Sequence, residues 1–184
     1  MEGKSDMAMP KTDRRAGPKV GSRTGFTLIA NVLPGHEKAL RESLAEDQAD
    51  PAADAALDEI GTLHEFRFVL IDDDRRIMFC SSFDGDWDKY VEDFIRTAIG
   101  GMIDKTLQHA EGWVGIKDPG ASEWLLAHGV PAVSYKSAYP QPSVKQVWKA
   151  LAVQEAFQQA LDDPAAEEAL QHPALKPMLD LAAD

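Results

Sequence analysis

Two charged side chains and a histidine in one predicted strand have the chemistry and spacing to line a cavity. Glu65 and Arg67 alternate along the apolar run 63–71, so they share one strand face, and His64 lies on the other. A guanidinium offers a planar fork for a carboxylate or phosphate, and an imidazole titrates near neutral pH. We therefore predict Arg67 and His64 as catalytic residues. The alternatives are an ion pair of Arg67 with Glu65 or with a partner chain, and a hydrogen-bonded structural histidine.

Other motifs favour structural roles. The run Asp84–Asp88 resembles the start of a calcium loop, but Lys89 and Ile95 stand where an EF-hand needs Gly and Glu. Helix capping is therefore favoured. The single cysteine, Cys80, excludes an intramolecular disulfide and a multi-cysteine metal cluster. The sequence has no phosphate-binding loop, serine nucleophile elbow or two-histidine metal spacing, so we predict no metal site.

The elements that position these residues are clearest in the middle of the chain. The apolar runs 63–71 and 77–83 flank three consecutive aspartates, which favour turns, so they predict an antiparallel hairpin. Apolar residues then recur at a spacing of three and four over 87–99. This spacing predicts a buried helix that Gly100 and Gly101 end.

Further elements on both sides of this hairpin and helix complete a fold. Residues 26–33 and 130–139 predict a first and a last strand, residues 36–46 a helix, and residues 143–161 a long final helix. The order strand, helix, strand, strand, helix, strand predicts a ferredoxin-like α+β sandwich. It has extra helices before the last strand and a C-terminal helix. One sheet face carries both polar and apolar side chains, and a monomer would expose it as a large, half-apolar patch. We therefore expect a homodimer around an enclosed space.

Composition narrows the classes of function. The chain has 184 residues and a net charge of −12, which argues against general nucleic-acid binding. No run of about eighteen apolar residues predicts a membrane span, and no signal-peptide core precedes the first strand. We expect a cytoplasmic protein with one domain over residues 25–162 and a loosely helical tail over 163–184.

Residues 1–24 differ from the rest of the chain. They hold six Lys or Arg residues against three Asp or Glu residues, with two prolines and few large apolar side chains. Such a composition predicts a disordered basic arm. The arm is interpreted either as a solubilising tail or as a segment that docks on an acidic partner.

Four segments carry a family resemblance: TGFTLIANVLPGHEKAL, GTLHEFRFVLID, IMFCSSFDGDWDKYVEDF and SAYPQPSVKQV. Over residues 25–150 the chain resembles the dimeric α+β barrel superfamily, and within it a bacterial group related to antibiotic-biosynthesis monooxygenases and chlorite dismutase-like proteins. The resemblance implies a homodimer whose barrel cavity binds a small apolar or aromatic ligand or haem. Monooxygenase- or peroxidase-like oxidative chemistry would follow. Haem-degrading members place an asparagine on the first strand, so Asn31 joins the predicted catalytic residues.

Two histidines at the ends of predicted helices are the cofactor-binding candidates. His109 and His128 could each serve as an axial haem ligand, although a histidine at a helix C-terminus also interacts favourably with the helix dipole. Whether the protein is an enzyme therefore stays open. The alternative function is a non-catalytic dimerisation or accessory module whose mixed sheet face serves as an interface.

Overall fold

The computed structural model describes residues 17–183, and the chain divides into two compact units, one ending at Val144 and the other beginning at Lys145. The sequence instead predicts a domain that ends at residue 162. The predicted basic arm lies outside the described residues over 1–16. Its last part is regular structure, because β1 (Lys19–Val20) forms a hairpin with the beginning of the next strand.

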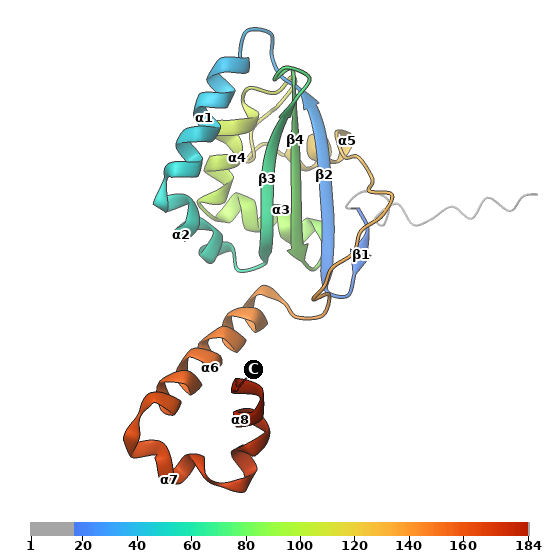
Figure 1. The fold of residues 1–184 in the computed structure, drawn as a ribbon. Helices are drawn as coiled ribbons and strands as arrows, with labels where there is room; N and C mark the ends of the chain where they lie inside the picture. The colour runs from blue at the N-terminus through green and yellow to red at the C-terminus, as the bar shows by residue number, and fades with distance from the viewer. Residues whose placement is uncertain (1–16, 184) are drawn as a thin grey trace, which may run out of the picture. The chain divides into compact units, whose positions relative to one another are not determined.

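The first unit is built on a four-stranded antiparallel sheet in the order β1-β2-β4-β3 (Figure 1). Besides β1, its strands are β2 (Arg23–Asn31), β3 (Leu63–Ile71) and β4 (Arg76–Asp84). The predicted hairpin is confirmed, with an acidic turn in which Asp72, Asp73 and Asp74 all adopt positive φ. Helices accompany this sheet, so the predicted α+β class is confirmed.

The period-two pattern of the strands assigns most side chains to the correct face. Leu28, Phe79 and Phe68 form one row across the sheet on its buried face. Thr27, Cys80 and Arg67 form a row on the opposite face, which we call the open face. A β-bulge between Leu63 and Glu65 shifts the register, so Leu63 pairs with Phe83 and is buried rather than on the predicted open face.

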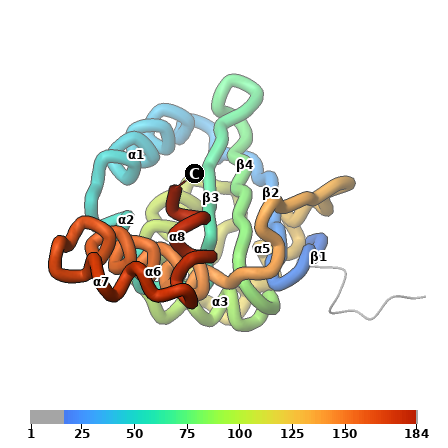
Figure 2. Tube along the Cα trace, turned by 60° about the horizontal axis from the view of Figure 1, so that its bottom comes forward, coloured from blue at the N-terminus to red at the C-terminus, as the bar shows by residue number. Residues whose placement is uncertain are grey.

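Four helices lie on the β3 side of the sheet or cover its buried face, and a fifth stands near β2 (Figure 1). The helices are α1 (Glu37–Ala49), α2 (Pro51–Ile60), α3 (Trp87–Arg96), α4 (Ile99–Leu107) and α5 (Ala121–Ala127). Figure 2 shows α1 and α2 beside β3 from another direction. The helix α2 begins at Pro51 because the Asp50 side chain accepts a hydrogen bond from Ala52 N and proline occupies the first helical position.

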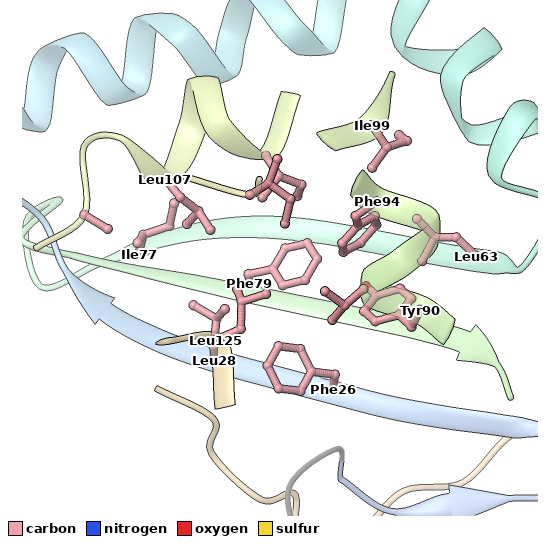
Figure 3. Packing of buried hydrophobic residues seen from close by; sticks show 14 of the residues in the cluster. Phe26, Leu28, Leu63, Ile77, Phe79, Tyr90, Phe94, Ile99, Leu107 and Leu125 are labelled. Carbon is pink, nitrogen blue, oxygen red and sulfur yellow. The ribbon is translucent and has the colours of Figure 1, made fainter. Parts of the chain in front are cut away.

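Aromatic side chains dominate the core between the sheet and α3. Tyr90 stacks on Phe83 with ring centroids 3.7 Å apart, and its hydroxyl lies 2.6 Å from Ser81 Oγ. Complete burial raises the pKa of Tyr90 far above its ordinary value. Figure 3 shows Phe94 of α3 and Phe79 of β4 in the same layer. The core therefore depends on the amphipathic pattern that the sequence shows over 87–99.

The predicted end of that helix is wrong. α3 stops at Arg96, and Gly100 and Gly101 lie inside the next helix, α4. A Cβ on Gly100 would stand 2.2 Å from the carbonyl oxygen of Phe94. A glycine is therefore needed for close packing between the two helices, and not for the helix end that its sequence position suggests.

The predicted last strand over 130–139 is also wrong, since the structure shows no strand there. The chain makes an isolated bridge between Gly129 and Leu28 and then leaves the β2 edge. Two features account for this. Pro131 has no N–H to donate, and the other end of the β2 edge is occupied because Gly25 N donates to the carbonyl of Pro18.

The helix α6 (Val144–Asp162) begins with the last residue of the first unit. The second unit holds the rest of α6 with α7 (Glu167–Leu170), α8 (Lys176–Ala182) and two short 3-10 turns. The long helix is confirmed. However, the side chains that predict its buried stripe are largely exposed, and Leu151 and Val153 are each more than half accessible. No helix in the described part of the chain is long and apolar enough to cross a membrane.

Gly100 and Gly101 give a matched test of the α3–α4 packing. We expect Gly100→Ala to lower the free energy of unfolding by about 1–3 kcal/mol, because the added methyl group must displace backbone. Gly101→Ala should be neutral or stabilise by up to about 1 kcal/mol, because nothing lies within 4 Å of its Cβ position. Urea unfolding measures both values. Equal effects of the two substitutions would contradict the packing described.

Candidate functional site

A groove of about 450 Å³ lies between β3 and the helices α1 and α2. Its position follows from the sheet order, because β3 is an edge strand with β4 on one side. In Figures 1 and 2, α1 and α2 stand beside the free side of β3. Both apolar and ionisable side chains line the groove: Leu44, Asp47, Gln48, Ala53, Asp54, Leu57, His64, Glu65, Phe66, Arg67, Phe68 and Met102.

His64 lines this groove and is held from behind by a carboxylate. Its Nε2 donates to Asp84 Oδ1 over 2.9 Å, and the two side chains are 9% and 13% exposed. Within the described residues, Nδ1 of His64 makes no hydrogen bond, so that nitrogen is free for a ligand. The β-bulge falls at His64, between Leu63 and Glu65, so the strict alternation of faces does not apply to this residue. The hydrogen bond to Asp84 agrees with the structural alternative for His64, and its catalytic role stays a prediction.

Asp84 ties three separate segments together at this end of the sheet. Besides His64, the carboxylate accepts from Val144 N over 2.8 Å and more weakly from Ser22 Oγ over 3.5 Å. These donors come from β3, from Val144 at the end of the first unit and from the β1–β2 turn. A carboxylate with several donors is well solvated by the protein, and it fixes the orientation of the imidazole.

Arg67 also lines the groove and has no ionic partner among the residues that the structure describes. The predicted pairing of Arg67 with Glu65 does not occur, and Glu65 and Asp54 also lack ion pairs there. Asp47 differs, because Lys105 donates to it over 2.9 Å. The groove therefore presents one free guanidinium and two free carboxylates near its apolar lining.

Asn31 does not line this groove, so the structure does not bring the three predicted catalytic residues together. It stands at the last position of β2, where its Nδ2 donates to Glu111 Oε2 over 3.0 Å. Asn31 lines a second, shallower hollow of about 460 Å³ together with Arg75 and Arg76. Strand periodicity places Asn31 and Arg67 on one face but does not show that they lie in different rows.

The two histidines predicted to bind a cofactor lie apart from the groove. The ring of His128 stacks on Trp124, and its Nδ1 donates to the Trp124 carbonyl over 2.8 Å. His109 Nδ1 lies 3.1 Å from Nδ1 of His36. Burial and repulsion from His36 lower the pKa of His109. Since neither residue lines the groove, the described site does not fit a haem bound by these ligands.

Sequence reasoning missed several residues that build the groove. The sequence predicts Asp84 as a helix cap, but its carboxylate accepts a hydrogen bond from His64 instead. Leu57 and Met102 come from α2 and α4, and they reach the groove because both helices pack together beside β3. The sequence gives only a weak signal for the contact between Asp84 and His64. Asp84 ends β4, and the β-bulge in β3 determines which β3 residue lies opposite it.

No protein-family model, curated protein or solved structure matches this chain.

Replacing Asp84 tests the contacts around His64. We expect Asp84→Ala to lower the free energy of unfolding by about 2–3 kcal/mol, because it leaves largely buried donors of His64 and Val144 unpaired. Urea unfolding measures the change. Asp58→Ala is the control, since Asp58 is exposed on α2 and makes no ion pair or hydrogen bond within the described residues. A loss no larger than that of the control would contradict the role given to Asp84.

Proposed function

We propose that this protein binds a small molecule with an apolar or aromatic body in the groove between β3 and α1–α2. The single observation that carries the proposal is the lining itself, in which apolar side chains surround a free guanidinium and an anchored imidazole. A concave apolar site with a few polar groups is the usual form of a small-molecule pocket. The volume of about 450 Å³ lies within the ordinary range for such ligands.

The apolar part of the ligand would contact the aromatic wall. Phe66 and Phe68 lie edge to face with ring centroids 5.8 Å apart, and both are half-buried. Leu57 and Met102 contribute aliphatic surface from the helices opposite. Aromatic rings favour offset or edge contacts with a further ring, so a flat aromatic ligand suits this wall best.

His64 and Arg67 would bind the polar part of the ligand. The free Nδ1 of His64 can accept a hydrogen bond while Asp84 holds the other nitrogen, and Arg67 suits a carboxylate. Asp54 and Glu65 disfavour a ligand with several negative charges. We therefore propose a monoanionic aromatic ligand.

Oxidative chemistry is the further step that the family resemblance implies, with dioxygen as the oxidant, and it would begin with the loss of a proton from the substrate. An imidazole whose second nitrogen is oriented by a carboxylate is suited to remove a proton from a bound phenol or enol. We propose His64 for that role and Arg67 for charge stabilisation of the bound anion. Haem is not part of this proposal, because His109 and His128 lie outside the groove.

A second candidate function is dimerisation through the open sheet face. Ile29, Met78 and Val69 form a half-buried apolar row on that face, beside Arg67. In a two-fold symmetric pairing, Arg67 of one copy could meet Glu65 of the other, since such interfaces are self-complementary. Such a pairing corresponds to the homodimer that the sequence analysis predicts, and Glu65 of the second copy would compete with a ligand carboxylate for Arg67.

Filling the groove tests the binding proposal. We expect wild-type protein to bind 1-naphthoate saturably and Ala53→Phe to lose at least tenfold in affinity, because the new ring occupies the groove. Ala55→Phe is the control, since Ala55 is exposed on the same helix outside the groove. Isothermal titration measures all three proteins. Equal affinities for both variants, or no binding by the wild type, would overturn the proposal.

The same titration separates the polar role of Arg67 from the apolar contact. Arg67→Gln should weaken 1-naphthoate about two- to fivefold, as expected for an exposed charge pair. Its affinity for the neutral 1-naphthalenemethanol should not change.

Sedimentation equilibrium tests the dimer. We expect wild-type protein to sediment at twice the chain mass, and Met78→Lys to sediment as a monomer because the lysine charge would be buried in the interface. Ile95→Lys, on the exposed side of α3, should remain dimeric. A monomeric wild type, or a dimer that Met78→Lys leaves intact, would show that the open face is no interface.

A further inference from the structure

His36 and His109 form a pair of imidazoles at the end of the first unit, away from the groove. Their Nδ1 atoms lie 3.1 Å apart, and the ring planes are inclined at 67°. The residues are 73 positions apart in the sequence. No metal-binding spacing connects them, so sequence analysis could not pair them.

The backbone holds both histidines in place through one shared residue. Leu33 N donates to the carbonyl of His109 over 2.8 Å, and His36 N donates to the carbonyl of Leu33 over 2.9 Å. His36 also precedes α1, where its carbonyl accepts from Leu40 N over 2.9 Å. The two Cα positions are therefore fixed by main-chain hydrogen bonds, and each ring has freedom mainly about its side-chain torsions.

We propose that His36 and His109 together bind a divalent transition-metal ion through their Nδ1 atoms. Two imidazole nitrogens bound at about 2.0–2.1 Å to one ion stand roughly 3 Å apart, which is close to the separation here. Without metal, one ring donates its Nδ1 proton to the other ring. Binding requires both Nδ1 lone pairs, so the donor ring carries its proton on Nε2 instead, and no proton is lost.

The two imidazole ligands indicate which metal ions would bind and how open the site would be. Imidazole nitrogen suits Cu²⁺, Ni²⁺ and Zn²⁺, and the usual order of affinities makes Cu²⁺ the tightest. Within the described residues, no group of three or more His, Cys, Asp or Glu side chains is arranged to hold a metal ion. Water would therefore complete the coordination. Such a site exchanges its metal readily and leaves positions open to a further ligand, unlike a closed structural zinc site.

Metal titrations of the untagged full chain test this site. Calorimetry with Ni²⁺, and separately with Cu²⁺, should show one saturable site, with Cu²⁺ binding more tightly. His36→Asn and His109→Asn should each lower the affinity at least tenfold, because either change leaves a single imidazole. His128→Asn and His172→Asn are matched controls and should bind like the wild type.

Two results would overturn the proposal. One is the lack of saturable Ni²⁺ and Cu²⁺ binding by the wild type, which would reduce the pair to an imidazole–imidazole hydrogen bond. The other is binding that survives His36→Asn, which would place the metal elsewhere. His36 is exposed, so its variant is expected to fold, and thermal unfolding checks this. In the wild type, the metal should also raise the midpoint of thermal unfolding, because it binds the folded state.

Discussion

The contact between Asp84 and His64 is the constraint on which the rest of the site depends. It joins the last residue of β4 to the bulge of β3, and the same carboxylate also binds the backbone of Val144 at the end of the first unit. Because both side chains are largely buried, an unsatisfied partner would be costly, and the three segments are held together. The same contact orients the imidazole that lines the groove, so the fold and the site share one interaction.

The groove itself results from the position of β3 at the edge of the sheet. An inner strand would have neighbours on both sides, whereas β3 leaves a side that faces α1 and α2 (Figure 2). An aromatic side chain of β3 can therefore pack in the core and line the groove at the same time. Phe68 packs against Phe79 in the core with ring centroids 4.9 Å apart, and it also lines the groove. The core therefore supports the groove wall directly.

Sequence periodicity predicts much of the fold, but not the contacts between distant segments. The alternation in 63–71 places Arg67 and Phe68 on opposite faces correctly, because strand geometry is local. Leu63 is misplaced because a bulge changes the register, and Gly100 is misread because its close approach to Phe94 depends on how two helices pack. The strand pattern singles out His64 and Arg67 as candidate site residues, but it does not show that both line one groove at the β3 edge. Asp84 and the His36–His109 pair could not, because only the folded chain brings each pair together.

The central claim is that a small aromatic anion binds beside β3, and amide chemical-shift mapping tests it most directly. The ¹H–¹⁵N spectrum would be recorded during a titration of the wild-type chain with 1-naphthoate. The amides that shift most should lie in Leu63–Ile71 and in α1 and α2, with Phe66 and Leu57 among them. Shifts concentrated around Asn31 and Arg76, or no saturable shifts, would contradict it.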